Sequence, residues 1–128
     1  MSDERRIIST PNAPKALGPY SQGVVAGGFV FTAMQIPLDP STGTLAADDV
    51  QAQTRQVLQN LAAILQAAGS SLGRAVKVTL YLKDLGDFAA VNEAYAAFFP
   101  EEPPARAVVE VAALPRGARV AAEAIALA

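Results

Sequence analysis

Three segments that are typical of β-strands are apolar at neighbouring positions and not only at every second one. They span Phe29-Met34, Val76-Leu82 and Arg119-Leu127. Because successive side chains of a strand point to opposite faces of a sheet, both faces of this sheet are expected to be apolar and to need a cover. The alternative is an alanine-rich sheet that tolerates exposure because its side chains are small.

One long helix is predicted from Asp48 to Ala68. Its apolar residues recur at helical spacing and are Val50, Val57, Leu58, Leu61, Ile64, Leu65 and Ala68. Asp48 suits the N-cap position, with Gln51 three residues later as in a capping box. Gly69 suits the left-handed position that ends a helix.

A second helix is predicted after Asp87, where one apolar face continues to Pro100. The apolar residues of this face are Phe88, Val91, Tyr95 and Phe98. The remaining strands are predicted at Ile7-Ile8, Gly23-Ala26 and Arg106-Val111, and Gly27-Gly28 is typical of a hairpin with a primed turn.

The predicted order is three strands, a helix, a strand, a helix and two strands. This order indicates an α+β fold with one mixed six-stranded sheet and both helices on a single face. The 128 residues suit one domain, 1–128, because two domains would each be too small to bury enough surface. The second apolar face is then expected to be covered by another copy of the chain.

Composition excludes several kinds of chemistry. The chain has no cysteine and no histidine, which rules out Ser-His-Asp and Cys-His catalysis and disfavours a transition-metal site. Acid-base work is left to Asp, Glu, Tyr or Lys. A net charge of −2 without a basic block disfavours a nucleic-acid partner. The sequence has no apolar run of membrane-spanning length, and its first residues lack the apolar core of a secretory signal, so a cytoplasmic protein is expected.

Arg106 and Glu123 are the first candidates for a functional site. Arg106 stands close behind Pro103-Pro104 at the start of a strand, where the fixed backbone can aim its guanidinium at a carboxylate. The alternative is a surface ion pair or a charge that protects a strand edge. Glu123 is the only charge in an otherwise apolar run, so it faces a cavity or forms a salt bridge, for which Arg119 is a candidate.

Tyr20 and Asn92 are weaker candidates. Tyr20 follows Gly18-Pro19, which restricts the loop and could hold the phenol over a pocket; ordinary packing is the alternative. Asn92 is interpreted as out of phase with the apolar residues of its helix, which favours solvent over a pocket. Lys15, Lys77 and Lys83 are interpreted as solvated lysines, and no phosphate-binding glycine motif occurs.

Four motifs, in order and at consistent spacing, resemble the RidA/YjgF family of reactive-intermediate imine deaminases along nearly the whole chain. They are NAPKALGPYSQGV, QIPLDPSTG, KVTLYLKDLGDFAAVNEAYAAFF and PPARAVVEVAALPRGARVAAEAIA. The resemblance implies a chorismate-mutase-like α+β fold and a homotrimer with a site at each subunit interface. Such a trimer agrees with the uncovered sheet face.

The resemblance also implies the reaction and the roles of the candidate residues. Arg106 would bind the substrate carboxylate, Glu123 would position or activate water, and Tyr20 and Asn92 would line the pocket. The substrate would be a 2-imino acid, or its enamine tautomer, released by a PLP enzyme. Hydrolysis would give a 2-oxo acid and ammonia without a metal or cofactor, because an imine hydrolyses in water unaided.

Two positions depart from the family pattern near the expected substrate-binding site. Ala33-Met34 replaces a Ser/Thr-Gly pair before Gln-Ile-Pro, and Val108 stands where Cys, Ser or Thr often follows the arginine. Met34 therefore affects pocket size, and Val108 removes a hydrogen-bonding group. A non-catalytic module that binds a 2-oxo acid or another small carboxylate remains an alternative. An endoribonuclease or translation inhibitor is disfavoured by the acidic pI and the absence of histidine.

Overall fold

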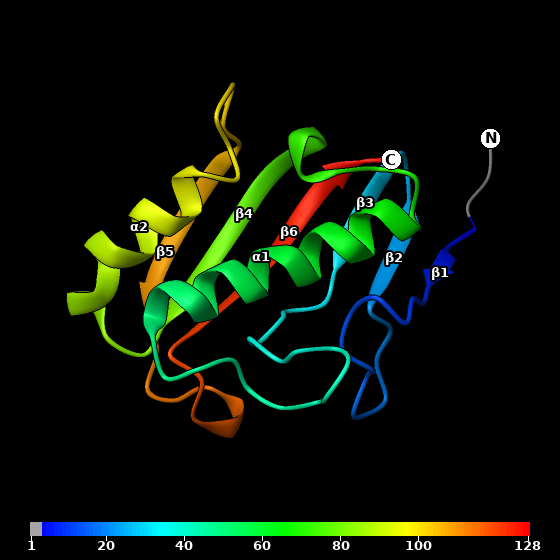
Figure 1. The fold of residues 1–128 in the computed structure, drawn as a ribbon. Coiled ribbons are helices and arrows are strands. Elements are labelled where there is room, and N and C mark those ends of the chain that lie inside the picture. Colours follow the sequence, from blue (N-terminus) through cyan, green and yellow to red (C-terminus); the bar gives the residue numbers. More distant parts are fainter. Residues whose placement is uncertain (1–3) are drawn as a thin grey trace.

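The computed structural model describes residues 4–128, in which two helices lie on one face of a mixed sheet (Figure 1). The strands are β1 (Arg6–Ile8), β2 (Gly23–Ala26), β3 (Phe29–Thr32), β4 (Ala75–Leu82), β5 (Ala105–Glu110) and β6 (Val120–Leu127). The helices are α1 (Val50–Ala67) and α2 (Phe88–Ala96), with short 3-10 turns η1 (Leu72–Arg74), η2 (Leu85–Asp87) and η3 (Pro115–Gly117). The predicted α+β architecture is confirmed. The expectation that the first residues lack the core of a secretory signal falls partly on residues 1–3, which lie outside the described residues.

The strand order across the sheet is β1-β2-β3-β6-β4-β5. All neighbours are antiparallel except β4 and β5, which run parallel and are connected through α2. β5 is consequently an edge strand with the short α2 beside it (Figure 1). Within residues 4–128, no helix is both long and apolar enough to cross a membrane.

Local turn chemistry forms the hairpin between β2 and β3 as predicted. Gly27 and Gly28 have φ angles of 58° and 83°, the left-handed values that a primed two-residue turn requires at both positions. β3 is shorter than predicted and ends at Thr32, although Gln35 still forms a bridge to Ala122 of β6. α2 also ends early, at Ala96, and the chain turns before Pro100.

The core lies between the helices and the sheet. α1 contributes Val57, Leu58, Leu61, Ile64 and Leu65, which are fully buried against aliphatic residues of the strands. Gly23 of β2 shows how close this packing is. A Cβ atom placed there would lie 2.8 Å from Cγ2 of Ile64.

Two buried amides fix the loops on the core. Gln22 accepts a hydrogen bond from the Thr10 N–H (2.7 Å) and donates to the carbonyls of Thr10 (3.1 Å) and Pro14 (2.8 Å). Asn60 of α1 donates to the carbonyl of Leu38 (2.9 Å). These bonds satisfy irregular backbone that is buried or partly buried, and they hold the loops that precede β2 and follow β3 in fixed positions.

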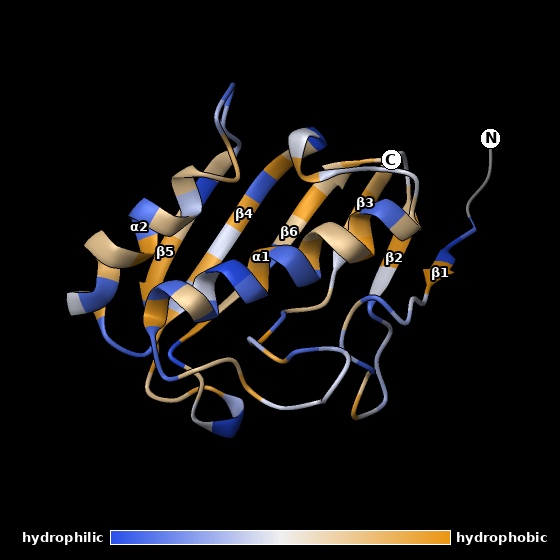
Figure 2. Ribbon diagram, in the orientation of Figure 1, coloured by the Kyte–Doolittle hydropathy of each residue, from blue (hydrophilic) through white to orange (hydrophobic). Residues whose placement is uncertain are grey.

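The sheet face turned away from the helices is apolar, and none of the helices and strands described in residues 4–128 covers it. We call it the open face, and its residues include Ile7, Val24, Phe29, Phe31, Tyr81, Val109, Glu123, Ile125 and Leu127. Figure 2 shows apolar residues along β3, β4 and β6. Phe31 is 42% exposed and Val109 is 43% exposed. The predicted second apolar face is confirmed, and its large aromatic side chains argue against the alternative of tolerated alanines.

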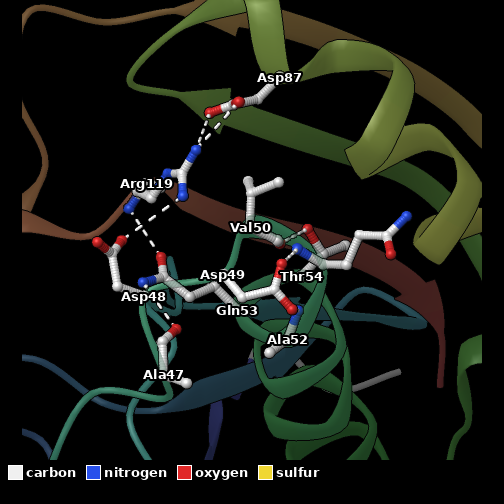
Figure 3. Close-up of polar contacts among 10 residues, drawn as sticks. Ala47, Asp48, Asp49, Val50, Ala52, Gln53, Thr54, Asp87 and Arg119 are labelled. Atoms are coloured by element: carbon white, nitrogen blue, oxygen red, sulfur yellow. Dashed lines mark hydrogen bonds and ion pairs between the residues drawn. The ribbon is translucent and has the colours of Figure 1, made fainter.

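The N-cap of α1 differs from the prediction. Asp49, and not Asp48, caps the helix, since its carboxylate accepts from the N–H groups of Gln51 and Ala52, both at 3.3 Å (Figure 3). Asp48 instead lies 3.5 Å from Arg119. Gln51 does not reach back to the cap and donates to the carbonyl of Ala90 in α2 (3.1 Å), so the capping box was wrong. Gly69, with φ 84°, ends the helix as predicted.

We expect Asp49→Ala to lower the free energy of unfolding by about 1 kcal/mol, because two N–H groups lose their acceptor. Asp48→Ala is the matched control and should change it by less than about 0.5 kcal/mol, since Asp48 is almost fully exposed. Urea unfolding at one fixed protein concentration measures both values. A larger effect at Asp48 would contradict this cap assignment.

Candidate functional site

Arg106 lies at the start of β5 and is held by three residues of α2. Its guanidinium carbon is 4.9 Å from the centre of the Tyr95 ring and 5.5 Å from that of Phe88. Its Nη1 donates to Oδ1 of Asn92 at 2.7 Å. We call these three residues the cradle. Both rings are close enough for cation–π attraction, so the cradle fixes the position of the charge.

The interpretation that Asn92 is out of phase with the apolar residues of its helix was wrong. Phe88, Asn92 and Tyr95 are spaced at i, i+4 and i+7, which places them on one side of α2. The Asn92 side chain is exposed and nevertheless bonds Arg106. The spacing was visible in the sequence, but the position of β5 beside this side of the helix was not.

The Arg106 guanidinium is available to an incoming carboxylate. In the described part of the chain, no acidic side chain lies within ion-pair distance of it. Asn92 occupies one of its nitrogens, and a guanidinium offers five N–H donors in a planar fork, so a bidentate edge is left. Burial raises the pKa of Tyr95, and the positive charge of Arg106 only partly opposes this, so the phenol stays neutral.

A groove of about 440 Å³ opens beside Arg106. It is lined by Asn92, Tyr95, Ala96, Phe99, Pro103, Pro104 and Arg106. Val108, which the sequence suggested as a substrate contact, is not part of this lining. It pairs with Leu80 of β4 and packs against the core, on the same helix-covered face as Arg106.

A second cavity, of about 380 Å³, brings together Tyr20, Ala33 and Met34. Its full lining is Pro14, Lys15, Leu17, Tyr20, Ala33, Met34, Gln35, Ile36, Leu38, Pro115 and Arg116. The Tyr20 hydroxyl accepts a weak hydrogen bond from the Leu17 N–H at 3.4 Å, and its side chain is half-exposed. Tyr20 and Met34 therefore line the same cavity. Contact between Tyr20 and a substrate in this cavity stays a prediction.

Arg116 is a cavity residue that sequence reasoning missed. It lies in η3 with a left-handed φ of 61°, and its Nη1 donates to the Gly43 carbonyl at 3.0 Å. The quartet Leu114-Pro115-Arg116-Gly117 was interpreted only as a link between strands. A non-glycine residue held at positive φ beside a cavity is a feature that only the structure reveals.

Glu123 lies on the open face and bonds a different partner from the one suggested. The Tyr81 hydroxyl donates to Oε1 of Glu123 at 3.0 Å, and burial, followed by Glu123 itself, raises the pKa of Tyr81. The suggested salt bridge with Arg119 is wrong. Arg119 precedes β6 and turns toward the helices, where its Nη2 lies 3.1 Å from Asp87.

One chain does not bring Arg106, Glu123 and Tyr20 together. Arg106 pairs with Val78 of β4, and Glu123 pairs with Thr79 of the same strand. Because neighbouring residues of a strand face opposite ways, Arg106 lies on the helix-covered face and Glu123 on the open face. The cavity with Tyr20 includes η3, which follows the far end of β5 (Figure 1). No group of three potential metal ligands occurs among residues 4–128.

Comparison with known proteins shows close relatives over nearly the whole chain. Residues 10–128 match the family model described as Endoribonuclease L-PSP. RutC family protein PH0854 of Pyrococcus horikoshii is 55% identical, over 95% of this chain and 97% of its own. The 2-iminobutanoate/2-iminopropanoate deaminase of Salmonella typhimurium is 53% identical, with the same coverage of both chains.

A solved structure agrees with these relatives. Escherichia coli TdcF with bound serine superposes with a TM-score of 0.92 at 48% identity, and the match covers 96% of this chain and 98% of that one. The resemblance identified from the four sequence motifs is thereby confirmed. The chain belongs to the Endoribonuclease L-PSP family, which includes the RidA/YjgF deaminases.

Proposed function

We propose that this protein hydrolyses 2-imino acids to 2-oxo acids and ammonia. The observation that carries the proposal is Arg106, a cation fixed in the cradle with a bidentate edge left for a carboxylate. Relatives about half identical to the chain are named 2-iminobutanoate/2-iminopropanoate deaminase, and their substrates carry a carboxylate beside the imine.

The proposed reaction depends on the positioning of substrate and water more than on a strong nucleophile. Arg106 holds the substrate carboxylate, and water adds to the C=N carbon. Protons from this water pass to the nitrogen, the C–N bond breaks, and ammonia leaves a 2-oxo acid. Since imines hydrolyse unaided, orienting substrate and water with one proton shuttle is sufficient. No step of this reaction requires a metal or cofactor.

The site is completed, in this proposal, by a neighbouring subunit of a homotrimer. Three features support this: the uncovered open face, the edge position of β5, and the separation of Arg106 from the cavity with Tyr20. Assembly through the open face would cover its aromatic side chains. An interface that also includes the edge strand β5 would let one subunit present Tyr20, Ala33 and Met34 to Arg106 of the next. Glu123, on the open face, would serve the water from the sheet side of that interface.

A carboxylate-binding module without catalysis is the second candidate. It is favoured by the separation of Glu123 from Arg106 within one chain, because binding needs only the arginine. A ribonuclease fits less well. The chain has a net charge of −2 and no histidine, and the described residues that line the Arg106 groove include no second cation for successive phosphates.

We expect Arg106→Lys and Arg106→Ala each to lower kcat/KM by about a hundredfold or more, since an ammonium cannot reproduce the planar bidentate contact. The assay couples a PLP-dependent threonine dehydratase to its substrate and follows 2-oxo acid release with and without the protein. Arg55→Ala, on the exposed side of α1, is the control and should behave as wild type. Unchanged acceleration in the Arg106 variants would rule out the anchor.

Glu123→Gln separates a hydrolase from a pure binder. If Glu123 serves the water, turnover should fall about a hundredfold while affinity for 2-oxobutanoate, measured by calorimetry, stays unchanged. Tyr81→Phe is the companion variant, because it removes the hydroxyl that bonds Glu123 and keeps the carboxylate. Full turnover in Glu123→Gln would exclude a proton role for this residue.

Mixing two inactive variants tests whether the site lies between subunits. Arg106→Ala and Tyr20→Ala are each expected to be inactive, whereas subunits mixed and reassembled together should recover part of the activity. Recovery occurs because some interfaces then pair an intact Arg106 with an intact Tyr20. Native mass spectrometry verifies the mixed trimers. Mixed trimers without recovered activity would place both residues in a site within one subunit.

A further inference from the structure

Arg119, at the entry to β6, joins the beginnings of both helices. Its Nη2 lies 3.1 Å from each carboxylate oxygen of Asp87, and its Nη1 lies 3.5 Å from Oδ1 of Asp48 (Figure 3). Asp87 immediately precedes α2, and Asp48 lies shortly before α1. One guanidinium therefore contacts an acid next to each helix.

The backbone of Arg119 is fixed as firmly as its side chain. Its N–H donates to Oε1 of the buried Gln53 at 2.9 Å, and its carbonyl accepts from the Lys83 N–H at 3.0 Å. Gln53 belongs to α1, and Lys83 directly follows β4. Arg119 is thus a rigid point from which a neighbouring element can be positioned.

The two acids differ in how much water screens them. The Asp87 side chain is 20% exposed, whereas that of Asp48 is 91% exposed. Water screens the electrostatic attraction less in the Arg119–Asp87 pair, which is partly buried and has two short contacts. It screens most of the attraction in the longer, solvated Arg119–Asp48 contact. The Arg119–Asp87 pair is therefore the dominant half of this arrangement.

Asp87 is directly connected to the cradle. Its carboxylate makes no capping bond to α2, so it is available to Arg119. Phe88, the next residue along the chain, provides one of the two rings beside Arg106. α2 has only nine residues, so the position of its first turn also affects where Asn92 and Tyr95 lie.

We infer that the Arg119–Asp87 pair positions Arg106 through α2. Arg119 and Asp87 are positioning residues in this inference, because they contact neither the groove nor the guanidinium of Arg106. Loosening the pair would let the first turn of α2 move and would shift Phe88 and Asn92 relative to Arg106. The link to catalysis rests on the proposed function, whereas the link to Arg106 geometry does not.

The test compares two substitutions at the same guanidinium. Asp87→Asn removes the charge beside α2, and Asp48→Asn removes the charge before α1. We expect Asp87→Asn to weaken 2-oxobutanoate binding and to raise KM, each about tenfold, with a smaller effect on kcat. Asp48→Asn should leave both within about twofold, since its contact is solvated. Arg119→Lys should fall between these variants, because a lysine keeps the charge without the fork.

The Nε–Hε resonance of Arg106 provides a readout that is independent of activity, because neighbouring aromatic rings shift it. The Arg106→Lys spectrum assigns this resonance. A shift in Asp87→Asn that is absent in Asp48→Asn supports the inference. An unchanged resonance and affinity in Asp87→Asn, with only a lower unfolding temperature, would make the pair purely structural and overturn it. If wild type neither binds 2-oxobutanoate nor hydrolyses imines, the proposed function fails, and the resonance alone decides the positioning role.

Discussion

The packing of α1 against β6 is the constraint on which the rest of the structure depends. β6 lies centrally in the sheet and presents Ala122, Ala124 and Ala126 to the helix, all buried. These small side chains leave room for the large residues of α1, including Leu61 and Ile64. Because successive side chains of a strand point to opposite faces, Glu123, Ile125 and Leu127 lie on the open face. The packing of the helices and the character of the open face therefore have a single origin.

Local patterns were sufficient to predict most of the fold. The strands, the Gly27-Gly28 turn and both helices follow from periodicity and turn chemistry, which act between residues close in sequence. The errors concern choices that depend on distant residues. Asp48 and Asp49 suit an N-cap equally well by sequence, and Arg119, far along the chain, contacts Asp48. Likewise, Gln51 bonds α2 across the helix pair, which no local motif indicates.

The candidate site was less predictable because it depends on register between strands. Context and family resemblance were enough to select Arg106 and Tyr20 as candidates. Neither could show that Arg106 pairs with Val78 while Glu123 pairs with Thr79, a difference of one residue that places them on opposite faces. The cradle also required knowledge of which side of α2 meets β5. Asn92 was therefore interpreted as solvent-facing although its spacing from Phe88 and Tyr95 was visible.

The uncovered face and the divided site are best understood together. A single subunit exposes aromatic surface on the open face and leaves its concave surfaces open to water, with Arg106 beside one and Tyr20 beside the other. Under the proposed assembly, contact between subunits would cover the open face and would join the groove beside Arg106 to the cavity beside Tyr20 of a neighbour. Burial of apolar surface would then drive folding, association and formation of the site alike. Substrate and water would then be oriented together only in the completed site. Under the proposed assembly, activity would depend on association of the subunits even though each chemical group is already present in the monomer.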